Sequence, residues 1–501
     1  LYHLVPIENA AMQDRSVIQW DKDDLESLGL LKVDVLALGM LTAIRKSFAL
    51  IKQHYQHSFN IAQITAMGDD HQVYNMIQQR PGPIQGGMVH PFLKNRAEPR
   101  LIEHPSPELK AVLERTSGVP IFQEQVIKIA MVAAGFSGGE ADKLRRAMGS
   151  WKKTGELTNF REKLITGMSQ RGYTLEYSER IYKQICGFGE YGFPESHSAS
   201  FAVLAYVSSW LKHYYPAGFY VGLLNSWPMG FYSPAQLIQD AKRHEIEILP
   251  VCVNSSDYDH TMEYHNRNWA IRLGIRLVKG ANNIDADKLI KQRPKSGFTG
   301  INQIKGLNLP SHFIEAIASA NAFHSVCENR YATRWLLMDT ENDLPLLNQQ
   351  KTSKTNNIPC PSQTEILLED YRATTLSLHS HPISLLRQAN LLPRYTPANK
   401  LAAQPNQTHI SVIGLVIGRQ RPGTSKGVTF ITLEDDTGNI NVVVWLATSR
   451  AQQQAYLKST ILQVKGILER GDGDVTHIIA GKLVDFSHLL EELNNKSRDF
   501  H

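Results

Sequence analysis

The stretch Leu28-Gly-Leu-Leu-Lys-Val-Asp-Val-Leu-Ala-Leu-Gly-Met-Leu41 decides how the chain is interpreted. Apolar and polar residues alternate from Leu31 to Leu36, which predicts a strand with one apolar face, because successive side chains point to opposite sides. Lys32 and Asp34 then share the polar face, roughly 7 Å apart along the strand. There the carboxylate can hold a divalent metal while the ammonium meets a phosphate that the metal also touches. The same spacing also fits an exposed ion pair on the wet face of a sheet.

The residues around this strand resemble the bacterial C-family DNA polymerases, the relatives of the polymerase III alpha subunit. The similar sequence runs from Gln19 to Ala43, QWDKDDLESLGLLKVDVLALGMLTA, and it resembles the error-prone, damage-induced branch more than the replicative one. The resemblance implies that the strand belongs to the palm. It also implies that Asp34 is one of three carboxylates that bind the catalytic Mg²⁺ ions, and that Lys32 neighbours a phosphate.

Composition predicts a large intracellular protein. The 501 residues are 42% hydrophobic and 20% charged, enough for about three or four domains. The net charge of +5 permits a polyanionic partner. No apolar run approaches the ~20 residues of a membrane span. The first residues, Leu-Tyr-His-Leu-Val-Pro, do not resemble a signal peptide and lack an initiator Met. We therefore expect the chain to come from the middle of a longer protein.

The four cysteines form no metal or disulfide pattern, which fits a reducing cytoplasm. They are Cys186, Cys252, Cys327 and Cys360.

A basic segment follows within a mostly helical region. Residues 141–183 contain ten Lys and Arg residues against five Asp and Glu residues. In Lys143-Leu-Arg-Arg-Ala-Met148 the adjacent Arg145 and Arg146 present two guanidinium groups that suit phosphate oxygens. A solvated basic face is the alternative interpretation. By the resemblance, both arginines lie beside the incoming triphosphate.

A glycine-rich stretch precedes another predicted helix. In Gly187-Phe-Gly-Glu-Tyr-Gly-Phe-Pro-Glu-Ser-His-Ser-Ala-Ser-Phe201 three glycines favour a tight turn. Ser196 or Ser198 can cap a helix that runs to about His213. A helix N-terminus readily binds an anion. The alternative is that the serine only caps the helix and that His197 has no role in binding.

The same stretch resembles the Tyr-Gly-Phe-x-x-Ser-His-Ser motif of the family's fingers. The likeness implies that Tyr191, Ser196 and His197 line the nucleotide pocket near the sugar and base. Pro194 and Glu195 stand where the replicative relatives carry a polar and a basic residue.

Three further segments precede the last predicted domain. Residues 244–279 contain short strand-like runs. Residues 296–323 predict two short helices around a glycine-containing turn and resemble a helix-hairpin-helix, which holds a DNA phosphate through backbone amides, here near Lys305 and Gly306. A plain αα-hairpin is the alternative. The polar residues 339–365 predict a linker, in which Asp343-Leu-Pro-Leu-Leu347 faintly resembles a sliding-clamp-binding peptide.

The last predicted domain is all-β. About five short strands over residues 408–485, with the turn in Phe430-Ile-Thr-Leu-Glu-Asp-Asp-Thr-Gly438, favour an OB-fold. Such barrels bind single strands on a basic, aromatic-studded face. The candidate residues for this face are Arg419, Arg421, Lys426, Phe430 and Trp445. The alternative places the two aromatic rings in the core.

Two departures from the family limit what this chain is expected to do. The family's other two catalytic aspartates lie upstream of the position that matches Leu1, and Asp21, Asp23 and Asp24 match residues outside the metal set. Between Gln79 and Arg80 the family carries a few dozen further residues, which predicts an internal loss. We therefore expect the isolated chain to bind DNA without extending a primer.

The predicted fold is α+β and multidomain. Its parts are the end of a polymerase-beta-like palm (1–42), mostly helical fingers (43–290), a helix-hairpin-helix (291–330), a linker and connecting segment (331–400) and an OB-fold (401–490). The predicted function is a share of Mg²⁺-dependent, error-prone primer extension during translesion synthesis. The expected partners are primer–template DNA, dNTPs, single-stranded DNA at the OB-fold, and a sliding clamp or other mutagenesis proteins. The alternatives are a non-catalytic DNA-binding module or a decayed remnant.

Overall fold

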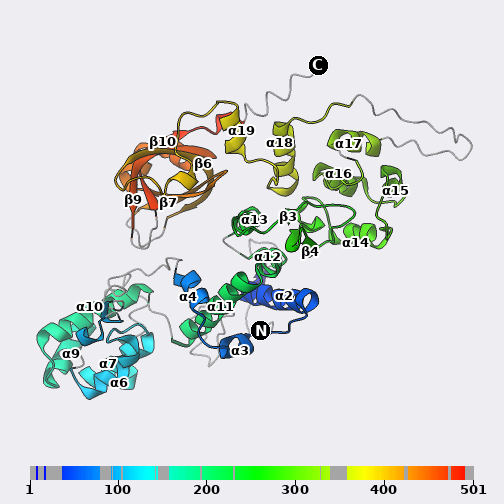
Figure 1. Ribbon diagram of the computed structural model, residues 1–501. Helices are drawn as coiled ribbons and strands as arrows, with labels where there is room; N and C mark the ends of the chain where they lie inside the picture. Colours follow the sequence, from blue (N-terminus) through cyan, green and yellow to red (C-terminus); the bar gives the residue numbers. More distant parts are fainter. Residues whose placement is uncertain are drawn as a thin grey trace, which may run out of the picture.

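The structure, a computed structural model, describes most of the chain beyond residue 36 (Figure 1). The described residues are 7–9, 16–18, 37–78, 92, 94–96, 98–102, 105–141, 143–144, 157–191, 195–229, 232–327, 329–338, 358–421, 427–471 and 476–490. Near the start, strands β1 (Ile7–Asn9) and β2 (Ser16–Ile18) pair in antiparallel fashion. The strand predicted around Lys32 and Asp34 lies outside the described residues.

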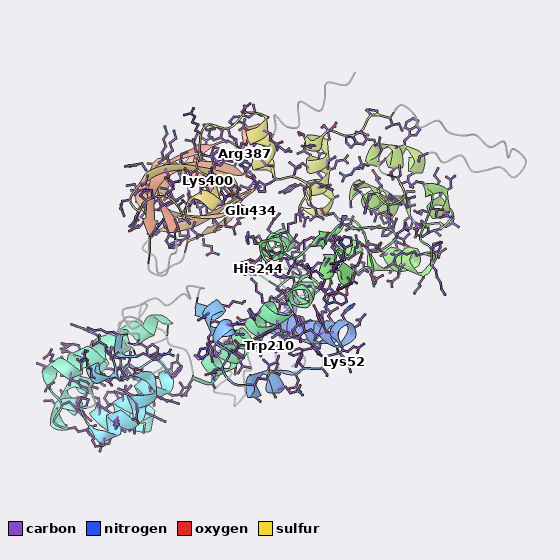
Figure 2. All side chains as sticks on the ribbon, in the orientation of Figure 1. Lys52, Trp210, His244, Arg387, Lys400 and Glu434 are labelled. Atoms are coloured by element: carbon purple, nitrogen blue, oxygen red, sulfur yellow. The ribbon has the colours of Figure 1, made fainter. Side chains whose placement is uncertain are left out.

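A first hydrophobic core lies in the middle of the molecule, where Figure 2 labels Trp210. Its helices are α2 (Leu38–Tyr55), α3 (Ile61–Ala66), α4 (His71–Gln78), α11 (Glu195–Tyr214), α12 (Pro216–Leu224) and α13 (Pro234–Arg243). Every residue of α12 after Pro216 is buried, as expected for a helix that is apolar on all sides. Gly222 permits its close approach to α2, since a Cβ atom there would lie 2.7 Å from the Ala43 carbonyl oxygen.

The same core continues into a small sheet and a group of short helices. Strands β3 (Ile248–Leu249), β5 (Asn268–Arg272) and β4 (Thr261–His265) form a sheet in that order, with β3 parallel and β4 antiparallel to β5. Phe313 and Phe323 bring the hairpin region into the core. The helices here are α14 (Asn283–Lys291), α15 (Ile301–Lys305), α16 (Ser311–Ser319) and α17 (Arg330–Met338), after the 3₁₀ turn η3 (Ile275–Leu277).

A second, separate core joins four helices, which lie together at the lower left of Figure 1. They are α6 (Pro107–Leu113), α7 (Gln123–Ala134), α9 (Leu157–Gln170) and α10 (Leu175–Tyr191), with the 3₁₀ turns η1 (Pro99–Leu101) and η2 (Glu114–Thr116). Helix α7 ends at Ala134, because Gly135 adopts the left-handed conformation (φ 73°). Among the residues that the structure describes, no buried apolar residue belongs to both the first and the second core.

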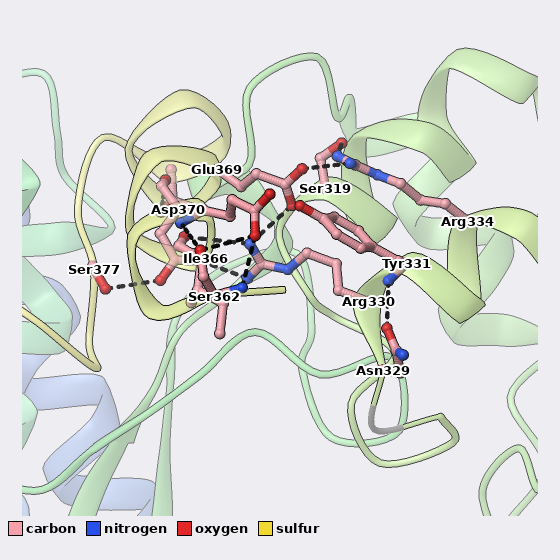
Figure 3. Close-up of polar contacts among 12 residues, drawn as sticks. Ser319, Asn329, Arg330, Tyr331, Arg334, Ser362, Ile366, Glu369, Asp370 and Ser377 are labelled. Carbon is pink, nitrogen blue, oxygen red and sulfur yellow. Dashed lines mark hydrogen bonds and ion pairs between the residues drawn. The ribbon is translucent and has the colours of Figure 1, made fainter. Parts of the chain in front are cut away.

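Two helices connect the hairpin region with the last domain. They are α18 (Gln363–Thr374) and α19 (Pro382–Gln388). A buried ionic network holds α18 (Figure 3): Arg330 Nη2 donates to Asp370 Oδ1 at 2.5 Å and Arg330 Nη1 to Glu369 Oε2 at 3.2 Å. Ser377 Oγ donates to the other oxygen of Asp370 at 2.8 Å.

The last domain is a closed five-stranded barrel with the order β10-β8-β7-β6-β9. Its strands are β6 (His409–Gln420), β7 (Thr429–Asp435), β8 (Gly438–Val444), β9 (Ile461–Arg470) and β10 (Thr476–Asp485). The 3₁₀ turn η4 (Ala398–Lys400) precedes them, and α20 (Leu446–Ala451) and α21 (Gln453–Lys458) lie between β8 and β9. The α+β multidomain class and the OB-type barrel are thus confirmed.

Two predictions of local structure are wrong. Gly187 and Gly189 lie within α10 instead of forming a turn, since glycine in a helix costs only about 1 kcal/mol and packing can outweigh it. Helix α11 already begins at Glu195, so Ser196 and Ser198 lie in its first turn.

Candidate nucleic-acid interface

Two aromatic rings lie on the outside of the barrel. In β7 the side chains of Thr429, Ile431 and Leu433 are buried while Phe430 is 40% exposed, as the alternation of a strand requires. Trp445 directly follows β8 and is 52% exposed. Both rings therefore face solvent, and the interpretation of these rings as core residues is wrong.

Strand pairing continues the face of Phe430 across the barrel. Val443 of β8 is its partner in register, and Ile479 of β10 is in turn the partner of Val443. All three apolar side chains lie at least partly exposed on the outward face, beside the polar Thr432 and Asn441. An outward apolar row flanked by polar side chains suits stacked bases, because every base has an apolar face.

Basic residues stand where β6 ends, next to this face. Gln420 pairs with Phe430, so Arg419 and Arg421 flank the position opposite the ring. Arg419 donates from Nη2 to the Ser459 carbonyl oxygen, and burial lowers the pKa of its guanidinium from the usual value. Arg421 is exposed, and Lys426 lies outside the described residues. Arg421 is thus the described arginine that is more accessible to a phosphate.

The structure adds two lysines that the sequence analysis missed. Lys465 of β9 and Lys482 of β10 are exposed and directly paired in register. Like charges opposite each other on neighbouring strands are unfavourable unless an anion lies near. A β-bulge between Ala480 and Lys482 brings them into register, so only the strand pairing reveals the pair.

The predicted hairpin is present as α15 and α16. Lys305 is half-buried at the end of α15, and Gly306 is exposed and has a right-handed helical conformation (φ −66°). Asn308, with φ 49°, makes the left-handed turn in place of a glycine. Among the described residues, no backbone carbonyl accepts from the amides of the exposed Asn308 and the buried Leu309, which suits a turn that holds an oxyanion.

The third place with predicted site residues is the start of α11. Ser196 is exposed, and the half-buried His197 ring lies 4.5 Å from the ring of Phe201 between centroids. Figure 1 shows that α11, the hairpin helix α15 and the barrel lie in different parts of the molecule. The structure therefore does not bring the described candidate residues together in one site.

Several predicted site residues lie outside the described part of the chain. They are Lys32, Asp34, Arg145, Arg146 and Lys426, together with the side chain of Tyr191. Within the described ranges, no three His, Cys, Asp or Glu side chains lie close enough together to hold a metal ion. Likewise, no described helix combines the length and apolar character of a membrane span.

The sequence matches four family models in chain order. These are the bacterial DNA polymerase III alpha NTPase domain (residues 1–37), the bacterial DNA polymerase III alpha subunit finger domain (79–172), the helix-hairpin-helix motif (245–333) and the OB-fold nucleic acid binding domain (410–485). The barrel, α15 and α16 fall within the matched ranges.

Relatives named error-prone DNA polymerase align along the whole chain. Those from Vibrio campbellii, Vibrio parahaemolyticus and Idiomarina loihiensis are 58%, 57% and 48% identical, and each alignment covers 100% of this chain and 52% of the relative. The chain thus spans about half the length of these curated relatives. The alignment with the Vibrio campbellii protein is 538 positions long, so that relative has residues that this chain of 501 lacks.

A solved asparaginyl-tRNA synthetase from Pyrococcus horikoshii covers 19% of this chain and 23% of its own, at 17% identity and a TM-score of 0.17, too low to support any argument. The four domain matches and the full alignment with the relatives place the chain in a family. It belongs to the bacterial C-family DNA polymerases, in which it matches the carboxy-terminal half of the error-prone members.

Proposed function

We propose that this chain is part of an error-prone DNA-directed DNA polymerase that acts in damage-induced translesion synthesis. The observation that carries the proposal is its alignment along all residues with relatives of that name, at up to 58% identity. The four matched domains support it, because two are described as domains of the DNA polymerase III alpha subunit, one as a helix-hairpin-helix motif and one as a nucleic acid binding domain.

In the reaction, the primer 3′-hydroxyl attacks the α-phosphate of a dNTP and pyrophosphate leaves. Two Mg²⁺ ions, when bound, activate the hydroxyl and stabilise the charge of the transferring phosphate. We assign Asp34 as one metal ligand, and Lys32, Arg145 and Arg146 as the cations that neutralise the triphosphate. Tyr191, Ser196 and His197 would line the sugar and base. One carboxylate cannot hold both metals, so this chain alone should not extend a primer.

The remaining candidate residues would hold DNA away from the reaction centre. The outward face of Phe430, Trp445 and Val443 would stack single-stranded bases, with Arg421 and Lys426 near the backbone. The amides of Asn308 and Leu309, beside Lys305 and Gly306, would hold a phosphate of the primer–template duplex. A sliding clamp or other mutagenesis proteins are further partners of the proposal, as is a cytoplasmic location. The segment Asp343–Leu347 lies outside the described residues.

The decisive experiment joins this chain to the amino-terminal half of the Vibrio campbellii relative. With Mg²⁺, dNTPs and a primer–template, we expect the hybrid to extend the primer, while this chain alone binds the DNA without extension. A hybrid that binds primer–template with normal affinity but never extends it would favour the rival function, a non-catalytic DNA-binding module.

The barrel face is tested by the affinity of the full chain for a short oligo-dT strand. Phe430→Ala should weaken binding by about 1–3 kcal/mol, because one stacked base is lost. Tyr264→Ala is the matched control, since this ring on β4 is 64% exposed but lies outside the barrel. Affinity should also fall steeply with salt. Equal affinities of the two variants, or a flat salt response, would argue against this face.

A further inference from the structure

Three side chains join the two helical cores at the start of α11. The Arg115 guanidinium, in η2 of the second core, forms a two-pronged ion pair with Glu195, the first residue of α11: Nη1 contacts Oε1, and Nη2 contacts Oε2 at 2.5 Å. The Glu195 backbone N–H donates to the Glu124 carboxylate, at 2.9 and 3.1 Å from its two oxygens. Glu124 lies in the first turn of α7, which also belongs to the second core.

These contacts occupy the N-terminus of α11 with a protein carboxylate. The unpaired amides at a helix start carry a partial positive charge, which favours an anion there. By its sequence this helix start is a possible phosphate site, but the Glu124 carboxylate already lies there and accepts from its first N–H. A dNTP phosphate would therefore meet like charge from Glu124 at this position. Positively charged side chains at other positions would then bind the triphosphate.

The geometry of Arg115 is suited to holding two bodies in one arrangement. A guanidinium that meets both oxygens of a carboxylate fixes direction as well as distance. The Arg115 guanidinium also lies 5.9 Å from the centroid of the Phe122 ring, just before α7, which restricts its position. The partners are 80 and 71 positions apart in sequence, and within the described part of the chain the two cores share no buried apolar residue. The orientation of α11 against the second core therefore depends on these polar contacts.

We infer that Arg115, Glu124 and Glu195 are positioning residues that set the nucleotide pocket. This inference rests on the proposed function, in which Ser196 and His197 on α11 act on the dNTP. The ion pair fixes these two residues relative to the helices of the second core. Loss of the pair should therefore weaken dNTP binding more than it slows the chemical step.

The test reverses the charges one at a time and then together. Arg115→Glu and Glu195→Arg should each speed hydrogen exchange in the first turn of α11 of this chain, and the double variant should restore slow exchange. Arg161→Glu is the matched control, because the Arg161–Glu179 ion pair has a similar exposure but lies wholly within the second core. In the hybrid enzyme, each single reversal should raise KM for dNTP about 10-fold, with kcat changed less than about 3-fold. The double variant should return KM toward the wild-type value.

The outcomes separate this inference from the proposed function. If the wild-type hybrid extends primers and the single reversals leave KM unchanged, the positioning role is overturned while the polymerase function stands. If first-turn exchange is the same in all variants, the ion pair does not hold α11 and the inference is likewise overturned. If the wild-type hybrid is inactive, the proposed function fails, and the positioning role fails with it even where exchange responds.

Discussion

At the scale of single residues, Asp240 links three helices of the first core. Its Oδ2 accepts from Lys212 Nζ at 2.7 Å and from the Tyr220 hydroxyl at 2.5 Å. Lys212 is only 6% exposed, so its charge depends on this carboxylate. Burial alone would raise the pKa of Asp240, but the two hydrogen bonds outweigh it and lower the pKa to about 2.

This lowered pKa predicts acid sensitivity of the first core. Because the folded pKa lies below the unfolded value of 3.8, the charged form contributes about 2 kcal/mol of stability above pH ~4. That contribution is lost as the pH falls from about 4 to about 2. Asp240→Asn should speed hydrogen exchange in α12 at pH 7 and remove part of the acid dependence of this exchange. Asp287→Asn, on α14 outside this network, should leave both unchanged, and equal behaviour of the two variants would refute the assignment.

The orientation of Phe430 marks the limit of sequence prediction at this scale. In Thr429-Phe-Ile-Thr-Leu433 both alternating faces contain an apolar residue, so a period of two cannot say which face is inside. Lys465 and Lys482 were missed for a related reason, since their pairing depends on a β-bulge. The barrel itself was predictable from its run of short strands and turn residues.

At the scale of elements, the backbone of helix α12 lies close to the backbone of α2 at one glycine. A Cβ atom at Gly222 would lie 2.3 Å from Ser47 Oγ and 2.7 Å from the Ala43 carbonyl oxygen. Ser47 Oγ is itself held by a 2.8 Å hydrogen bond to that carbonyl, so neither atom can give way without a backbone shift. Such overpacking usually costs 1–3 kcal/mol.

Gly222→Ala should therefore destabilise the first core by about 1–3 kcal/mol. Gly218→Ala on the same helix is the matched control, because its Cβ would meet only ordinary contacts, 3.5 Å from Met262 Sδ and 3.8 Å from Ile51 Cγ1. The control gains helix propensity and should be neutral or slightly stabilising. Hydrogen exchange in α2 and α12 reports the difference, and equal stabilities would contradict the close-approach argument.

Helix ends were predictable where a backbone signal acts locally. Gly135 ends α7 because it adopts the left-handed conformation. Glycine reaches this conformation without help from neighbouring residues. By contrast, α10 runs through Gly187 and Gly189. A glycine inside a helix costs only about 1 kcal/mol relative to alanine, so these two glycines did not show where the helix ends.

At the scale of the whole molecule, the order of the parts could be predicted but not how they join. The resemblance supplied the sequence of palm, fingers, hairpin and barrel. The connections between them depend on pairs far apart in sequence, such as Arg330 with Asp370 and Arg115 with Glu195. Periodicity and spacing carry no information about such pairs, and no predicted site residue lies among these four.

The Arg330 network predicts one of these connections to be strong. Arg330 is 3% exposed, and its removal would leave the carboxylate of Asp370, at 12% exposure, without its cationic partner, while Glu369 would keep only its ion pair with Arg334. Arg330→Met should destabilise the contact of α17 with α18 by about 3–5 kcal/mol. Arg372→Met, on the exposed face of α18, is the control. Hydrogen exchange in α18 measures the effect, and exchange as slow as in the control would show that the network is dispensable.

The central claim is that this chain contributes a metal-binding carboxylate to a DNA polymerase. Its most direct test is primer extension with Mg²⁺ by the hybrid carrying Asp34→Asn, compared with Asp24→Asn, an aspartate assigned outside the metal set. The account predicts that Asp34→Asn lowers kcat at least about 1,000-fold, a loss of about 4 kcal/mol of transition-state stabilisation, with primer–template affinity retained. The hybrid with Asp24→Asn should keep a kcat within a few-fold of the unsubstituted hybrid. Extension that survives Asp34→Asn would contradict the account.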